Sequence, residues 1–509
     1  FEFKPPYYAI FGDREANLTQ GYLKKDFALD FRKNGFTDKD KSYWAAEPQE
    51  NVLLIGLDTS AENKFSGDLP KEFENWLNSP NDTVVLFALK LADSTVTWLS
   101  VLAFYALANR FLSLHRARYA LLLLLSTFMV TILSLISTPD VPLVICWTLS
   151  LFFLHKAVFE SKKIYWIWAG VMSGLCFDSK YTAIFLIIGL VGFLLISAKN
   201  RRLLFSRWFL LYLFCFGVTI LPVVIWNIRN GFASFKFQSE ARVNSMEGFH
   251  ISLPDFGGVI GHQSAILMPM LLFSLFYFLY RLIRKYKWRF TRIPDDLLFL
   301  LSFFVPLFLG FLFISFFYWV KLNWMMPAYI TGIIWICRYW NKKWLRIQLI
   351  FSLVLHLALA AEVIFYIVPV RSDDTWFGWE DFAGQVKTLR VEHPDAFIFS
   401  ADDYKTSAVL NFFLDEMVYS KNVVGERALQ FDFIGTDLRK LEGRDAIFID
   451  SNPRFTNLDN ENIIPSFYYK YFDRIVALKP ILVRKNDRVE RKFSVFLCNH
   501  YHLPGPLSH

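Results

Sequence analysis

The sequence predicts a polytopic α-helical membrane protein of about ten spans, with a short N-terminal α/β segment and a small C-terminal α/β domain. Composition is the first indication, since 54% of the 509 residues are apolar, only 20% are charged, and the mean hydropathy is +0.32. Soluble domains average about 45–50% apolar and about 25% charged residues. The second indication is that apolar runs of membrane length recur between 94 and 370, with the charged residues in short turns between them.

The first part, 1–90, reads as a soluble α/β segment. Strands are expected at 7–11, 52–57 and 83–87, with a helix near 70–77. No signal peptide is recognised at Phe1, so a segment on the outer side of the membrane would require an earlier span or signal.

The second part, 91–370, is the expected transmembrane domain. The 18 residues 119–136 would extend about 27 Å as a helix, close to the hydrocarbon thickness of a bilayer. The expected spans are 94–112, 119–137, 140–157, 164–179, 181–198, 206–226, 263–282, 296–317, 320–338 and 345–369.

The charges between the spans predict how they are oriented. Twenty Lys and Arg residues fall in one alternating set of turns, and five fall in the other set, at Lys180, Arg229, Lys236, Arg242 and Lys321. The positive-inside rule places the first set in the cytoplasm. The net charge of +8 therefore indicates membrane topology and not nucleic-acid binding. It follows that Asp140, Lys180, the 227–262 loop and the C-terminal domain face outward.

The third part, 371–509, is expected to be an extracytoplasmic α/β domain. Buried strands are predicted at 396–400, 446–450 and 474–478, and a helix at 407–413. The five cysteines show no spacing typical of a metal site or a disulfide framework.

Asp140 and Lys180 are the first candidates for chemistry. Asp140 follows Pro139 at the boundary between two apolar runs, and an ionised acid there is costly unless it is used or solvated. It could instead cap the helix that begins beside it. Lys180 ends a span and could either bind a phosphate or extend to the interface, and Asp178 could neutralise it.

Further candidates lie in two outer loops. Loop 227–262 carries aromatic residues and cations, among them Gln238 and Arg242, which could anchor the chain at the interface or receive a lipid headgroup. Lys321 and Asn323 lie at the membrane edge where two spans are joined, and each could simply be solvated. Lys180, Arg242 and Lys321 together would offer three cations to one phosphate.

An ordered set of motifs runs along the chain. The motifs are Thr138-Pro139-Asp140-Val141-Pro142-Leu143, Ser179-Lys180-Tyr181-Thr182-Ala183, Pro222 with Trp226-Asn227, Ser234-Phe235-Lys236-Phe237-Gln238, Asn323-Trp324, Pro327-Ala328-Tyr329, Phe377-Gly378-Trp379-Glu380 and Asp402-Asp403-Tyr404-Lys405-Thr406-Ser407-Ala408. Together they resemble the bacterial dolichyl-phosphate-mannose–protein mannosyltransferase-like family. This family includes the lipid A aminoarabinose transferases and belongs to the GT-C membrane glycosyltransferases.

The resemblance implies a bacterial inner-membrane enzyme that moves a sugar from a polyprenyl-phosphate donor to an extracytoplasmic glycolipid, polysaccharide or protein. It implies that Asp140 is a catalytic residue, at the second acidic position of the site, and that Lys180 helps to hold the donor phosphate. Arg242 and Lys321 are the further cations expected at that phosphate. Tyr181, Gln238, Asn323 and Trp324 are the expected substrate contacts. No metal site is assigned, although a requirement for a divalent metal is left open.

The N-terminal segment departs from this family. The family's first outer loop carries an acidic residue, whereas here 1–85 takes that place. Gly12-Asp13-Arg14-Glu15 faintly resembles the Gly-Asn-His-Asp/Glu motif of calcineurin-like metallophosphoesterases, but without the metal-binding histidine. The alternatives are therefore a non-catalytic or transporter-like membrane protein, or a fusion that has lost its first catalytic acid.

Overall fold

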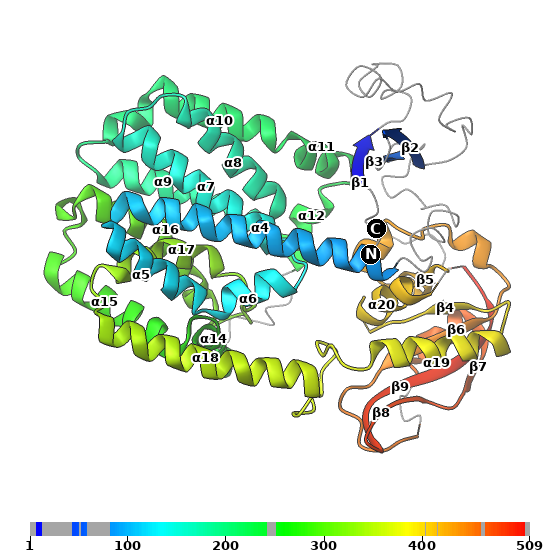
Figure 1. Ribbon diagram of the computed structural model, residues 1–509. Helices are drawn as coiled ribbons and strands as arrows, with labels where there is room; N and C mark the ends of the chain where they lie inside the picture. Colours follow the sequence, from blue (N-terminus) through cyan, green and yellow to red (C-terminus); the bar gives the residue numbers. More distant parts are fainter. Residues whose placement is uncertain are drawn as a thin grey trace. The chain divides into compact units, whose positions relative to one another are not determined.

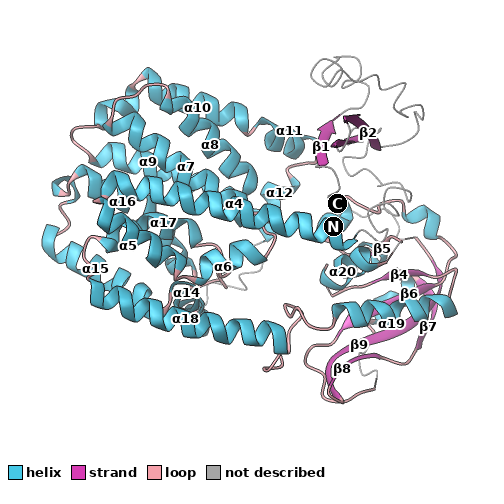
Figure 2. Cartoon of the chain, viewed as in Figure 1, coloured by secondary structure: helices cyan, strands magenta, loops and turns pink. Residues whose placement is uncertain are grey.

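The computed structural model describes residues 7–12, 43–49, 52–58, 82–241, 251–402, 404–414, 416–459 and 464–503. The chain divides into two compact units, Leu86–Ala360 and a second unit formed by Phe1–Val85 with Ala361–His509. The first unit is helical, and the strands of the described chain belong to the second (Figure 2). This agrees with the predicted class, a helical region accompanied by a small C-terminal sheet.

The helical unit is a bundle of apolar helices (Figure 1). Its helices are α4 (Asp82–Phe111), α5 (Leu114–Leu125), α6 (Phe128–Leu135), α7 (Asp140–Phe159), α8 (Tyr165–Ser179), α9 (Ile184–Ile196), α10 (Arg207–Thr219), α11 (Leu221–Arg229), α12 (Ala233–Lys236), α14 (Leu253–Leu267), α15 (Pro269–Tyr286), α16 (Asp295–Ile314), α17 (Met326–Cys337) and α18 (Lys342–Phe365). Short 3₁₀ turns η1 (Tyr181–Ala183), η2 (Arg201–Phe205) and η4 (Phe290–Arg292) and a π-turn (Phe237–Ala241) join some of them.

Fewer membrane-length helices are found than the ten expected. Four helices in the described chain are long and apolar enough to span a bilayer, and the number rises to seven if each of three bent helix pairs forms one span. The α5–α6 pair bends by 59° where the Ser126 and Thr127 hydroxyls donate to the carbonyls of Leu123 and Leu124. Hydroxyl groups that bond to nearby carbonyls compete with the helical ladder in this way.

The strand expected at 83–87 is wrong, because these residues form the start of the 30-residue helix α4. A short apolar run has no periodicity that distinguishes a strand from a buried helical segment. Here the run continues into the apolar sequence after it, so both become one helix. The lengthened helix brings Lys90 and Asp93 into the helical unit.

Close packing of α7, α8 and α10 forms one wall of the bundle. A Cβ atom at Gly174 would lie 2.4 Å from Cβ of Thr219, and one at Gly170 would lie 2.5 Å from the Tyr212 carbonyl oxygen. Small residues four positions apart let two helix backbones approach closely. At the same wall the Ser173 hydroxyl lies 2.8 Å from that of Ser150 and accepts a bond from Tyr212 at 3.0 Å.

The second unit contains two sheets. A three-stranded sheet has the order β1 (Tyr7–Gly12), β3 (Val52–Asp58), β2 (Tyr43–Gln49), and the first two strands are parallel. It confirms the strands expected at 7–11 and 52–57. The motif at 13–15 and the helix expected at 70–77 lie outside the described residues.

The larger sheet has the strand order β5-β4-β6-β9-β7, and β8 pairs with β9. Its strands are β4 (Phe397–Phe399), β5 (Val418–Tyr419), β6 (Ala446–Ser451), β7 (Phe472–Ala477), β8 (Ile481–Lys485) and β9 (Arg488–Tyr501). Helices α19 (Trp379–Glu392) and α20 (Lys405–Phe413) pack Phe382 and Leu410 against the face that presents Ile447 and Ile449. The three strands and the helix predicted for this domain are confirmed, whereas β5, β8, β9 and α19 were not anticipated.

Candidate functional site

Asp140 is the first residue of α7 and is 1% exposed. Pro139 fixes the backbone just before the helix, and Pro142 is tolerated because the first-turn amides have no intrahelical acceptor. The positive end of the helix dipole favours a carboxylate at this position. The side chain is bound by groups from two other segments, so it does more than begin the helix.

Lys180 and Asn323 each bind one oxygen of the Asp140 carboxylate. The Lys180 ammonium lies 2.8 Å from Oδ1, and the Asn323 amide donates to Oδ2 at 2.5 Å. Lys180 follows α8 in an extended conformation, and Asn323 lies in the turn between α16 and α17. A buried ion pair is favourable only when its remaining lone pairs are also satisfied, and the amide does this here.

Tyr181 connects this cluster to α11 and the short helix α12. Its hydroxyl lies 2.6 Å from that of Ser234, and the Ser234 hydroxyl lies 2.7 Å from Oδ1 of the fully buried Asn227. The Tyr181 ring packs 5.3 Å from that of Phe235. The residue after the phosphate-binding candidate is therefore held by its ring and by its hydroxyl.

The other predicted site residues differ in their surroundings. Lys321 is exposed two residues before Asn323, and Gln238 is exposed on the π-turn Phe237–Ala241. Trp324 is buried, with its ring stacked 6.1 Å from Tyr318 and tilted 5.2 Å from Phe311. Arg242 lies outside the described residues. Of the predicted set, the structure brings together Asp140, Lys180 and Asn323, and Tyr181 lies beside them.

Two buried oxygens beside Lys180 have no partner within the described chain, namely Oδ1 of Asp178 and Oγ1 of Thr182. Lys180 pairs with Asp140, and no bond between it and Asp178 is found. Buried polar atoms are nearly always hydrogen-bonded, so an orphan in a native structure often marks a place for water or a ligand. Two such atoms within two residues of the lysine indicate capacity for further polar binding.

A contact between α4 and the turn before Asp140 was not predicted from the sequence. The Lys90 ammonium donates to the Leu135 carbonyl at 2.8 Å, and the Ser137 hydroxyl donates to Asp93. Asp93 is thus a second carboxylate near this end of the bundle. The apolar run at 84–87 continues into the apolar sequence of α4. If it had been assigned to that helix, the sequence would have placed Asp93 within α4.

The cation-rich turns meet at the opposite end of the bundle. Arg110 and Lys162 both pair with Glu160, which follows the last residue of α7, and Arg338 pairs with Asp296. The Arg338 side chain also donates to the Phe111 carbonyl. Asp140 and Glu160 therefore mark two chemically different ends of one 20-residue helix. Which of these ends faces the cytoplasm stays a prediction from the positive-inside rule.

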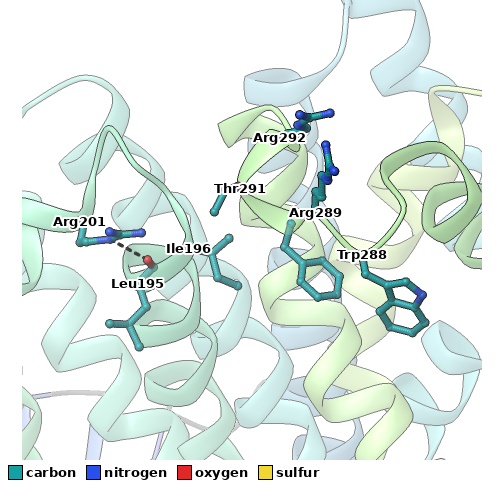
Figure 3. A pocket seen from close by; sticks show the side chains of 8 residues that line it. Leu195, Ile196, Arg201, Trp288, Arg289, Thr291 and Arg292 are labelled. Atoms are coloured by element: carbon teal, nitrogen blue, oxygen red, sulfur yellow. Dashed lines mark hydrogen bonds between the residues drawn. The ribbon is translucent and has the colours of Figure 1, made fainter.

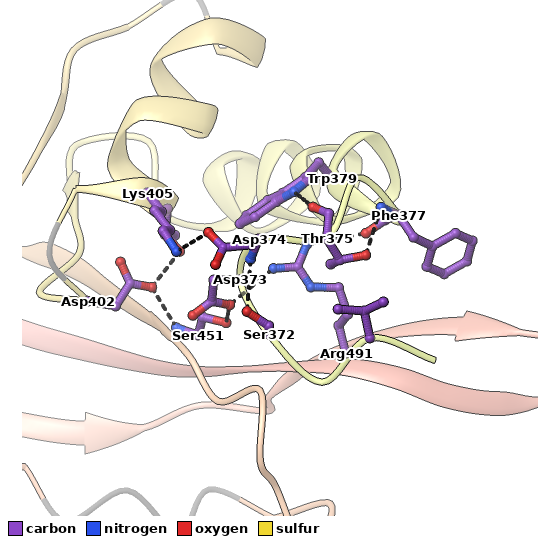
Figure 4. A network of polar contacts seen from close by, with 12 residues as sticks. Ser372, Asp373, Asp374, Thr375, Phe377, Trp379, Asp402, Lys405, Ser451 and Arg491 are labelled. Carbon is purple, nitrogen blue, oxygen red and sulfur yellow. Dashed lines mark hydrogen bonds and ion pairs between the residues drawn. The ribbon is translucent and has the colours of Figure 1, made fainter. Parts of the chain in front are cut away.

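The two C-terminal motifs meet in one polar network (Figure 4). Arg491 lies 3.7 Å above the Trp379 ring and pairs with Asp373, which accepts a bond from Ser451. The backbone amide of Ser451 donates to Asp402 at 3.0 Å. These bonds join the segment before α19 to the ends of β4 and β6.

Asp450 lies at the end of β6 beside this network. Burial, with the nearby Asp402 charge, raises the pKa of Asp450 to about 8. Burial also raises the pKa of Asp402, against hydrogen bonds from Thr406 and Ser400. One carboxyl of the pair thus retains a proton well above the ordinary range of aspartate.

No group of three or more His, Cys, Asp or Glu side chains in the described chain is placed to hold a metal ion. His262 contacts Trp319 edge to face, and His250 lies outside the described residues.

Comparison with known proteins gives one family match. Residues 83–226 match the dolichyl-phosphate-mannose-protein mannosyltransferase family. The matched region includes Asp140, Lys180 and Tyr181. A search of the curated proteins gives no match.

Two solved structures of ArnT from Cupriavidus metallidurans are similar to this chain. The form bound to undecaprenyl phosphate is 15% identical with a TM-score of 0.48, covering 84% of this chain and 87% of that one. The apo form is 16% identical with a TM-score of 0.47, covering 80% and 83%. The family match over residues 83–226 agrees with the resemblance to the mannosyltransferase-like family that the ordered motifs indicate.

Proposed function

We propose that this protein is a membrane glycosyltransferase that moves a sugar from a polyprenyl-phosphate donor to an acceptor outside the cytoplasm. The observation that carries the proposal is the Asp140–Lys180–Asn323 cluster, with two of its members in the family-matched segment. The undecaprenyl phosphate bound to the similar ArnT supports a lipid phosphate of the same class as the donor carrier.

Lys180 is the proposed donor-phosphate ligand. Its side chain is 20% exposed, whereas that of its partner Asp140 is 2% exposed, so the ammonium can be reached from outside the cluster. When the sugar leaves, negative charge develops on the phosphate, and a fixed cation stabilises that charge. The exposed Lys321 would supply a second cation, and Arg242 a third.

Asp140 has two proposed tasks in succession. Its carboxylate holds Lys180 and Asn323 in place. Binding of the donor phosphate would compete for the Lys180 ammonium and release one carboxylate oxygen. That oxygen could then accept the proton of the acceptor hydroxyl as a general base. Asp93, bound to the turn just before α7, is a second candidate for the acid that the family carries in its first outer loop.

The remaining assignments follow from the same cluster. Tyr181, Gln238 and Asn323 would contact donor or acceptor, while the buried Trp324 would shape the site from behind. The Asp140 end of the bundle and the C-terminal domain would face outward in a bacterial inner membrane. A glycolipid, a polysaccharide or a protein would serve as the acceptor.

The test is transfer of labelled sugar from a synthetic polyprenyl phosphate in membranes that contain the full chain. Asp140→Asn and Lys180→Ala should each reduce transfer by at least about a hundredfold, as removal of a charge-stabilising group commonly does. Lys180→Ala should also weaken donor binding, whereas Asp140→Asn should act mainly on turnover.

Glu160→Gln is the matched control, since Glu160 is an ion-paired acid at the other end of the same helix. It should leave transfer within about twofold of wild type, as expected for a surface substitution. Full transfer by both site variants would refute the site. Absence of transfer by well-folded wild type with every donor sugar tried would favour a non-catalytic protein.

A further inference from the structure

The end of the bundle opposite Asp140 contains a basic pocket that the proposed reaction does not use. The pocket has a volume of about 570 Å³ and lies between the end of α9 and the turn that joins α15 to α16. Its lining residues are Leu195, Ile196, Arg201, Trp288, Arg289, Phe290, Thr291 and Arg292 (Figure 3).

Two helices place this pocket away from the catalytic cluster. Helix α9 begins just after Lys180 and ends at Ile196 in the pocket, while α16 begins at Asp295 and leads toward Asn323. Asp295 accepts a bond from Ser197 at 2.7 Å, which joins the two helices at the pocket end. Because α16 has 20 residues, the two sites are separated by about 30 Å, the thickness of a hydrocarbon core.

Three arginines line this pocket, and none of its lining residues is an acid. Arg289 and Arg292 are three residues apart around the 3₁₀ turn η4, where side chains at this spacing lie on the same side. Arg201 faces them across the pocket and is oriented by a 2.9 Å bond from its Nε to the Leu195 carbonyl. The nearest acids along the chain are engaged elsewhere, Asp295 by Ser197 and Asp296 by Arg338.

The backbone of this turn is strained in a way that presents aromatic side chains. Lys287 and Trp288 are consecutive residues with φ of +46° and +62°, in a backbone region that residues other than glycine rarely adopt. Trp288 is 67% exposed, and its ring meets that of Phe290 edge to face at 6.0 Å. Strained residues persist only where the surroundings hold them, and they cluster at binding sites.

We propose that this pocket binds the phosphate group of an anionic phospholipid of the cytoplasmic leaflet. Planar guanidinium groups suit a phosphodiester, and basic pockets between membrane helices bind acidic headgroups. Tryptophan prefers the headgroup region. The exposed Leu195 and Phe290 in the wall provide apolar surface for the lipid tails, which a soluble phosphate would not need.

A neighbouring surface supports a lipid as the occupant. Tyr277 and Tyr280 of α15 are both more than half exposed, and they lie beside Arg281, Arg284 and Lys285 in a second basic pocket. Aromatic rings next to cations at the end of a membrane helix are typical of the headgroup layer. The basic pocket therefore continues a surface that already suits lipid.

The experiment counts phosphatidylglycerol molecules retained by the detergent-purified full chain in native mass spectrometry, in competition with phosphatidylcholine. Each arginine near an anionic headgroup contributes about 1 kcal/mol, or about fivefold in affinity. Arg289→Gln/Arg292→Gln should therefore weaken phosphatidylglycerol binding by about 25-fold. Lys342→Gln/Lys343→Gln removes the same charge from exposed residues that do not line the pocket, and should change the affinity by less than about threefold.

Three outcomes would overturn the proposal. The first is equal retention of the two lipids by wild type, which needs no variant. The second is an equal loss in both double variants, which would indicate unspecific surface charge. The third is binding of inorganic phosphate with the affinity of the lipid, which would indicate a soluble anion. Equal melting of all variants in phosphatidylcholine alone would show that the substitutions leave the fold intact.

Discussion

The Lys180 ammonium lies 2.8 Å from the Asp140 carboxylate although 40 residues separate them in the chain. The pair joins the beginning of α7 to the end of α8, and Asn323 adds a third segment. Because the carboxylate is buried, loss of either partner would leave a costly unpaired group. Its energetic coupling can be measured independently of activity.

Lys180→Met should destabilise the protein by about 3–5 kcal/mol, because it leaves the Asp140 carboxylate buried with its charge unpaired. The double variant Asp140→Asn/Lys180→Met should recover most of this loss, since no charge remains to be compensated. Thermal unfolding in detergent, followed by tryptophan fluorescence, measures both. Additive losses in the double variant would show that the two side chains are not coupled.

The contact between α8 and α10 predicts opposite effects for two glycines. Gly174→Ala should cost about 1–3 kcal/mol, because the new Cβ would lie 2.4 Å from that of Thr219. Gly217→Ala on α10 has open space around it and should be neutral or slightly stabilising, since alanine favours a helix. Both are read from the melting temperature of the full chain, and equal effects would contradict this packing.

The buried amide of Asn227 should matter more than the hydroxyl it binds. Asn227→Ala should cost about 1–3 kcal/mol because it removes the acceptor for the Ser234 hydroxyl and the Phe235 amide. Ser234→Ala should cost less, because Asn227 retains its other bonds. Asn109→Ala, at an exposed asparagine, is the control and should stay within about 0.5 kcal/mol of wild type. If Asn109→Ala lost as much stability as Asn227→Ala, the importance assigned to the buried Asn227 amide would be contradicted.

The C-terminal sheet should lose stability as pH rises from about 4 to about 8. Burial raises the pKa of Asp450 to about 8, so the folded state holds a proton in this window that the unfolded state has released. Asp450→Asn should abolish much of this pH dependence, because an amide does not titrate in this range. The fold should be kept, since the amide oxygen can still accept the 2.7 Å bond from the Ala401 amide.

Hydrogen exchange of the β4 and β6 amides in the full chain measures this effect at about pH 6 and about pH 8. Asp473→Asn is the control, since Asp473 is an exposed acid whose pKa is lowered by the neighbouring His502. An Asp450→Asn protein that retains the wild-type pH dependence would show that another group is responsible.

The sequence alone determined the membrane class, the positions of three of the C-terminal strands (β4, β6 and β7) and the identity of Asp140, Lys180 and Asn323 as candidates. Composition and apolar run length report on burial directly, so these features can be read without coordinates. The ordered motifs were sufficient for the family resemblance because they preserve both residue type and order.

Only the tertiary structure decided which candidates meet. Asp178 is two residues from Lys180 in sequence, yet Lys180 pairs with Asp140, because the chain turns after α8 and directs the lysine toward the start of α7. The helix bends, the helical conformation of 83–87 and the basic pocket were likewise not predicted from the sequence. Local pattern specifies which residues are apolar or charged, whereas contacts between segments depend on how helices pack.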